Sequence, residues 1–216
     1  MRQGVYKMMH MVKPRIYLIT PSNPEMHGNF PHLLNLLLEK YDIACLRLNL
    51  NSEKDHIIGK VADPLRRICQ KHDVAIIIEK HILLVEKFGL DGVHLKNGAK
   101  SIGKARKILG KDAIIGSFCG VSKHSAMKAA ELGADYVSFG PVDRTNINNQ
   151  VVAEVKLFEW WSQIIEVPVI AEGGFDRMSA NLIGQYADFI AFGEELWNSS
   201  DPVSTLEFLL GDFYNS

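Results

Sequence analysis

Short apolar runs alternate with longer segments of helical periodicity along most of the chain. Each run holds about four to six residues rich in Val, Ile, Leu and Phe, which is typical of strands buried in a parallel sheet. Eight such runs predict strands, over residues 15–20, 43–48, 74–78, 92–95, 113–117, 136–139, 167–171 and 189–192.

The segments between these runs predict helices, because their apolar side chains recur with the helical period. The predicted helices cover residues 30–41, 55–72, 81–88, 101–109, 122–132, 152–165, 179–186 and 202–213. Pro64 is expected to bend or interrupt the second helix, since proline has no amide hydrogen. Residues 21–31 and 143–150 predict loops.

One short pattern precedes three of the strands: a helix ends, an aspartate follows, and an apolar strand begins. The aspartates are Asp91, Asp135 and Asp188. Recurrence at about the length of one βα unit indicates a repeating barrel. The pattern therefore predicts an α/β fold, a single-domain (β/α)8 TIM barrel over residues 15–216, after a flexible tail of residues 1–14. A doubly wound sheet, which also alternates strands and helices, is the alternative.

The stretch from Val167 to Asp176 is the clearest candidate for ligand binding. Its apolar run is followed by Gly173 and Gly174, which can adopt positive φ and leave room for a ligand. Asp176 or Ser179 can cap the next helix, so that free amides converge beside the glycines. Such a place binds anions, most often phosphate. For this segment alone, a tight turn without a ligand is the alternative.

Composition narrows the function classes. A net charge of −1 without a basic run argues against nucleic acid as a partner. No apolar run has the length of a membrane span, and residues 1–13 lack the apolar core of a signal peptide. Cys45, Cys69 and Cys119 are widely spaced, as expected of free thiols in a reducing cytosol. We therefore expect a cytoplasmic protein. The sequence leaves open its oligomeric state, a homodimer included, and the roles of Cys45 and Cys119.

In a (β/α)8 barrel, ligands bind at the carboxyl ends of the strands, and phosphate usually binds near strands seven and eight. The residues expected at that end are Thr20, Arg47, Asn49, Glu79, His94, Lys96, Ser117, Cys119, Gly140, Thr145, Glu172, Gly173, Gly174 and Gly193.

Arg47 stands within an apolar strand, where a charge requires a partner. It can form an ion pair inside the barrel with Glu79 or Glu172, or it can bind a phosphate or diphosphate. Glu79 can be a general base, a metal ligand or the partner of Arg47, and the last is favoured. Glu172 directly precedes the glycine pair, so its carboxylate must be turned away or paired.

His94 lies on the fourth predicted strand and is either a core histidine or a ligand or acid–base group. Glu194 and Glu195 follow the eighth strand. They would repel phosphate if they faced inward, although acidic residues are also ordinary at the start of a helix.

Six segments occur in the order and with the residues of one known family. They are Ile-Tyr-Leu-Ile-Thr (16–20), Leu-Arg (46–47), Gly-Leu-Asp-Gly-Val-His-Leu (89–95), Ile-Ile-Gly-Ser (114–117), Gly-Ala-Asp-Tyr-Val-Ser-Phe-Gly-Pro-Val (133–142) and Val-Pro-Val-Ile-Ala-Glu-Gly-Gly-Phe (167–175). Over about residues 15–200 the chain resembles the thiamine phosphate synthases and their TenI-type relatives. The third and fifth segments are its most specific part.

The resemblance implies the (β/α)8 fold and a transferase of thiamine biosynthesis. These synthases join hydroxymethylpyrimidine diphosphate to a thiazole phosphate and release diphosphate, with Mg²⁺ as cofactor. The resemblance places the thiazole phosphate on Gly173 and Gly174, with Gly193 nearby and Thr145 in the loop after the sixth strand. Arg47 matches the arginine that grips diphosphate.

The chain departs from the family pattern around the diphosphate and the metal. Cys45 and Asn49 replace a Gln and a Lys of the second strand. The family's Asn-Asp-Arg, whose Asp is a magnesium ligand, is Glu79-Lys80-His81 here. Its Gly-Gln-x-Asp, which supplies a second ligand, is Lys96-Asn97-Gly98-Ala99. Glu79 is the one candidate to replace a metal ligand, and Mg²⁺ needs one or two carboxylates besides substrate phosphates.

Three functions follow from the residues and the resemblance. The first is a thiamine phosphate synthase-like reaction, with Mg²⁺ where that activity is retained. The second is a TenI-like thiazole tautomerase or another metal-independent enzyme on a phosphorylated small molecule, with His94 or Glu172 as the acid–base group. The third is a non-catalytic or regulatory barrel that binds a phosphorylated ligand.

Overall fold

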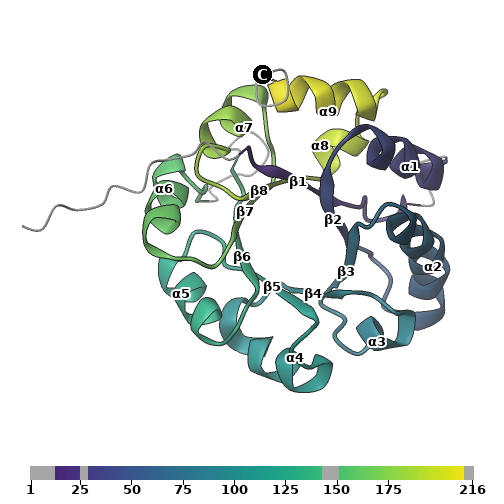
Figure 1. Ribbon diagram of the computed structural model, residues 1–216, viewed down its shortest axis with the longest axis horizontal. Helices are drawn as coiled ribbons and strands as arrows, with labels where there is room; N and C mark the ends of the chain where they lie inside the picture. Colours follow the sequence, from purple (N-terminus) through teal and green to yellow (C-terminus); the bar gives the residue numbers. More distant parts are fainter. Residues whose placement is uncertain (1–12, 25–28, 143–150, 212–216) are drawn as a thin grey trace, which may run out of the picture.

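The computed structural model describes residues 13–24, 29–142 and 151–211, and shows a closed barrel of parallel strands with helices on its outside (Figure 1). The strands follow one another around the barrel in chain order: β1 (Arg15–Ile19), β2 (Ile43–Leu48), β3 (Ala75–Glu79), β4 (Gly92–Leu95), β5 (Ile114–Phe118), β6 (Tyr136–Phe139), β7 (Val169–Glu172) and β8 (Phe189–Phe192). Because β1 pairs with both β2 and β8, the sheet closes. The predicted (β/α)8 fold is confirmed, and a doubly wound open sheet is excluded.

The helices cover the outer face of the strands (Figure 1). They are α1 (Phe30–Lys40), α2 (Asp55–Lys71), α3 (Leu84–Phe88), α4 (Ile102–Leu109), which a 3₁₀ turn over Gly98–Ser101 precedes, α5 (Lys123–Glu131), α6 (Val155–Ile164), α7 (Arg177–Ile183), α8 (Glu194–Trp197) and α9 (Pro202–Leu210). The sequence did not predict the four-residue α8. Pro64 does not interrupt α2, whose buried apolar residues lie on both sides of it. Within the described ranges, none of these helices combines the length and apolarity needed to cross a membrane.

The strands place their side chains alternately in two apolar cores. Tyr17, Cys45, Ile77, Tyr136 and Ile170 meet inside the barrel, whereas the larger core lies between the strands and the helices. Because side chains in a strand alternate with period two, the residues two places further along each strand also point inward, nearer its carboxyl end. These residues are Ile19, Arg47, Glu79, Ser138 and Glu172.

The repeated aspartate pattern is one structural device used at three corners. The carboxylates of Asp91, Asp135 and Asp188 accept hydrogen bonds from main-chain amides of the preceding strand segments, Ile76 at 2.7 Å, Ile115 at 2.7 Å and Val169 at 2.8 Å. The main-chain amide of each aspartate donates back to the carbonyl of the same residue. Each aspartate thus ties the start of one strand to the start of the strand before it.

The seventh strand is shifted from its predicted bounds. It begins at Val169 rather than at Val167, because Pro168 cannot donate to the ladder and contributes only its carbonyl, which accepts from Val137. It ends at Glu172 rather than at Ala171. Glu172 is thus the last residue of the strand, and its side chain points into the barrel mouth.

Candidate functional site

Polar side chains gather at the carboxyl ends of the strands, above the apolar filling of the barrel. Arg47, Glu79, His94 and Ser138 are all buried, and Glu172 is nearly so. Four of these five residues were predicted for this end. Ser138 was missed, although its place two residues after the inward-facing Tyr136 would have revealed it.

Arg47 crosses the mouth of the barrel and contacts two carboxylates. Its Nη1 donates to Glu172 Oε2 at 2.8 Å, and its Nε lies 3.8 Å from Glu79 Oε2. The sequence left open which of the two glutamates would pair with Arg47, and the structure pairs it with both. The predicted pairing of Glu172 and the favoured role of Glu79 as a partner of Arg47 are confirmed.

This ion-pair group extends to the fourth strand. Lys96, which follows β4, places its Nζ 3.2 Å from Glu79 Oε1. Unlike Arg47, it is 60% exposed at its side chain, so this outer pair contributes little. We call Lys96, Glu79, Arg47 and Glu172 the mouth network. It contains two cations and two carboxylates, which balance.

Burial makes the mouth network sensitive to the loss of a member. Burial alone would lower the pKa of Arg47, but the charge of Glu172 raises this pKa, and the net shift is upward. Arg47 therefore stays charged. Removal of one partner from a buried pair typically costs about 3–5 kcal/mol, because the other charge is left unpaired. Arg47 is thus held by protein carboxylates at the position where the resemblance expects a diphosphate.

His94 lies below the mouth network, in a buried hydrogen-bonded chain. Its Nδ1 is 2.8 Å from the hydroxyl of Tyr136, which lies 3.0 Å from the hydroxyl of Tyr17. Burial lowers the pKa of His94 well below its usual range, and the charges of Arg47 and Lys96 add to this effect. His94 therefore has the surroundings of a core histidine, in which its uncharged form is favoured.

The glycine pair forms the rim of the mouth beside β7. Gly173 and Gly174 both adopt positive φ, +90° and +78°, and a Cβ on Gly173 would lie 3.2 Å from Pro141 Cα. In the described part of the chain, neither glycine amide donates a hydrogen bond. Asp176 caps α7 by accepting from the amide of Ser179, so the first of the two predicted caps is used, within a capping box.

Gly193 lies at the same end, between β8 and α8. It is followed by two glutamates with different surroundings. Glu194 is exposed, whereas Glu195 is partly buried, and its Oε2 lies 3.8 Å from the place of a Cβ on Gly193. One of the two acidic residues therefore does turn inward.

The other predicted strand-end residues have structural contacts or lie outside the described ranges. Thr20 Oγ1 accepts from the amide of Asn49. Cys119 is buried 3.7 Å from Ser117 Oγ, and burial raises the pKa of its thiol as it does that of Cys45. Thr145 lies outside the described residues.

The mouth does not offer the two carboxylates that the resemblance requires for Mg²⁺. Glu79 is already paired with Arg47 and Lys96, Lys80 forms an ion pair with Glu53, and Ala99 has no ligand atom in its side chain. Among the described residues, no three His, Cys, Asp or Glu side chains are grouped as a metal site. These residues therefore do not fit a magnesium ion bound in the way that the resemblance implies.

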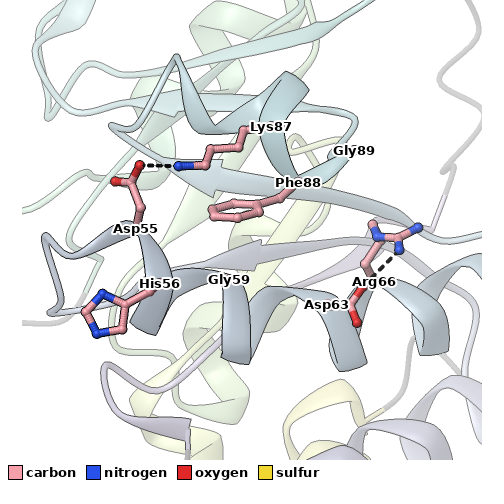
Figure 2. A pocket seen from close by; sticks show the side chains of 8 residues that line it. All are labelled: Asp55, His56, Gly59, Asp63, Arg66, Lys87, Phe88 and Gly89. Carbon is pink, nitrogen blue, oxygen red and sulfur yellow. Dashed lines mark hydrogen bonds and ion pairs between the residues drawn. The ribbon is translucent and has the colours of Figure 1, made fainter.

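A groove of about 840 Å³ lies away from the mouth, between α2 and α3 (Figure 2). Phe88 and Gly59 form its apolar floor, and ion pairs flank it, Lys87 with Asp55 and Arg66 with Asp63. Figure 2 shows Lys87 facing Asp55 and Arg66 facing Asp63, whereas His56 points away from these two pairs. The groove therefore offers no convergent chemistry, unlike the barrel mouth.

Comparison with known proteins decides the family. A family model described as thiamine monophosphate synthase matches residues 16–196. The chain belongs to this family. Among its relatives, thiamine-phosphate synthase of Erythrobacter litoralis is 34% identical over 203 residues, which cover 91% of this chain and 94% of that protein. The same enzyme of Rhodospirillum centenum is 37% identical over 190 residues, or 87% and 91% of the two chains.

A solved structure has the same fold. Thiamine phosphate pyrophosphorylase from Pyrococcus furiosus superposes with a TM-score of 0.77 at 19% identity, over 93% of this chain and 96% of that one. The match of the family model over residues 16–196 confirms the family resemblance drawn from six segments. The mouth network is the arrangement that this member of the thiamine monophosphate synthase family has at its strand ends.

Proposed function

We propose that this chain is a thiamine phosphate synthase-like protein that binds a phosphorylated thiazole at the rim formed by Gly173, Gly174 and Gly193. The observation that carries the proposal is the pair of glycine amides at the end of β7, which donate to no acceptor in the described residues and have positive φ. Main-chain amides without partners, in a turn with no side chain in the way, suit phosphate oxygens. Family membership supplies the chemical class of the ligand.

The reaction under this proposal is the family's transfer, in which the thiazole phosphate takes up the hydroxymethylpyrimidine group and diphosphate leaves. Arg47 is the residue of this chain suited to the leaving diphosphate, because its guanidinium can form two parallel hydrogen bonds to phosphate oxygens. The diphosphate must then replace Glu172 at Nη1 of Arg47.

A phosphate-binding barrel without turnover is the second candidate, and one observation favours it. Arg47 is buried and already has two carboxylate neighbours, so the protein satisfies this cation without any ligand. The tautomerase alternative has less support. Glu172 is held by Arg47, and Nδ1 of the neutral His94 is engaged with Tyr136.

The test is the formation of thiamine phosphate by the purified protein from hydroxymethylpyrimidine diphosphate and thiazole phosphate, with Mg²⁺ and with a chelator. Calorimetry with thiazole phosphate alone is run in parallel. Turnover supports the synthase. Binding of thiazole phosphate without turnover supports the second candidate, and absence of both rejects the phosphate rim.

A further inference from the structure

Glu195 is an acidic residue beside the rim that has no counter-ion among the described residues. No ion pair joins it to a lysine or arginine of the described chain. Its Oε2 lies beside Gly193, while its Oε1 is buried and has no hydrogen-bond partner in the described ranges. A buried carboxylate oxygen without a donor is costly, and native proteins seldom keep one without a reason.

The surroundings of Glu195 favour its neutral form. Burial raises the pKa of the Glu195 carboxyl, while the amides of Glu195 and Gly193 act in the opposite direction, and the charges of Glu194 and Glu172 raise it further. From β1, the residue beside Gly193 is the apolar Ile19. Arg47 is paired with Glu172 and has no direct contact with Glu195 among the described residues.

Two other buried atoms without partners lie at this end of the barrel. They are Oγ of Ser138, whose side chain is fully buried, and Nε of Arg47. Both residues point into the barrel from positions next to its mouth. Buried polar atoms without hydrogen-bond partners call for a partner at this end of the barrel, either a water or a polar ligand.

We propose that Glu195 is a specificity-determining residue of the rim: as a carboxylate it keeps phosphate from Gly193, and as a carboxylic acid it admits phosphate by donating a hydrogen bond. This inference rests on the proposed phosphate site. Binding at neutral pH then takes one proton from solvent onto Glu195. The acid O–H then points from the carboxyl oxygen beside Gly193 to a phosphate oxygen.

The experiment is calorimetric titration of thiazole phosphate at pH 6 and pH 8, in buffers of different ionisation enthalpy, so that proton uptake is measured with affinity. The wild-type protein is compared with Glu195→Gln, whose amide donates a hydrogen bond at every pH. The matched control is Glu194→Gln, which removes the same charge from the exposed neighbour.

In the wild-type protein, we expect affinity to fall roughly tenfold per pH unit above the pKa of Glu195, beyond the effect of the ligand's own titration. Glu195→Gln should lose this extra dependence, bind at least about tenfold more tightly than wild type at pH 8, and take up fewer protons. Glu194→Gln should keep the extra pH dependence and the proton uptake of the wild-type protein, with the fall in affinity beginning at slightly lower pH, because the charge of Glu194 helps to raise the pKa of Glu195.

Equal affinity and equal proton uptake in wild type and Glu195→Gln would overturn this inference and leave the phosphate site standing. The inference would also be overturned by a second result: Glu195→Gln binds thiazole phosphate more weakly than wild type at both pH values, and wild type binds the unphosphorylated thiazole alcohol more tightly than Glu195→Gln does. Glu195 would then be an acceptor for a hydroxyl. Absence of thiazole phosphate binding in all three proteins would overturn the phosphate rim and this inference together.

Discussion

At the scale of single residues, Arg47 shows what a sequence can and cannot reveal. A charge in an apolar strand predicts a buried partner, and Glu79 and Glu172 were both named as candidates before the structure. The sequence could not choose between them, because the choice depends on a side chain that spans the mouth from β2 to β7. Glu195 was harder still, since only burial separates it from its exposed neighbour Glu194.

Gly173 gives the sharpest test of the rim at this scale. We expect Gly173→Asp to lose thiazole phosphate binding by roughly 100-fold or more, because the new carboxylate would lie beside a phosphate. Calorimetry measures the affinity, and urea unfolding measures the stability.

The control for backbone strain is Gly133→Asp. Gly133 also has positive φ, +86°, with nothing within 4 Å of its Cβ position, and lies in the corner that leads from α5 to β6. The free energy of unfolding of Gly133→Asp should fall by about 1–2 kcal/mol, as for Gly173→Asp, while its affinity for thiazole phosphate should stay that of wild type. An affinity of Gly173→Asp close to that of wild type would remove Gly173 from the phosphate site.

At the scale of elements, the alternation of strands and helices was predictable because period two and period 3.6 leave different patterns. The ends of the elements were less predictable. The start of β7 depends on Pro168. The last residue of β7 is Glu172, whose side chain faces the mouth. Helix α8 is too short to show a helical period in the sequence. The inward orientation of Glu195 on this helix could therefore not be predicted.

The aspartate corners can be tested at the same scale. Asp188→Ala should lower the free energy of unfolding by about 1–3 kcal/mol, because the amide of Val169 would lose its acceptor in a partly buried position. Urea unfolding monitored by circular dichroism gives this value. Asp112→Ala, on an exposed bend before β5, should change it by less than about 0.5 kcal/mol. A loss for Asp188→Ala no larger than that of Asp112→Ala would show that the corner does not stabilise the barrel.

At the scale of the whole molecule, closure of the barrel brings together residues that are far apart in the chain. Arg47 and Glu172 are separated by 125 positions, and only the order of strands around the barrel places them within reach. The resulting mouth network balances two cations against two carboxylates without a metal ion. A balanced network of this kind has little excess negative charge with which to attract Mg²⁺.

We therefore expect Mg²⁺ alone to show no saturable binding in the micromolar range to the wild-type protein, as measured by calorimetry. Carboxylates at the two positions where the family carries metal ligands should create a site, because Mg²⁺ binds through one or two carboxylates and keeps several waters. The variant is Lys80→Asp with Ala99→Asp. Lys80 has a φ of +61°, which aspartate tolerates better than most residues. Tighter Mg²⁺ binding by this double variant would locate the lost site between β3 and β4. A discrete micromolar site in the wild-type protein would instead show that its own carboxylates, Glu79 included, rearrange to bind the ion despite Arg47 and Lys96.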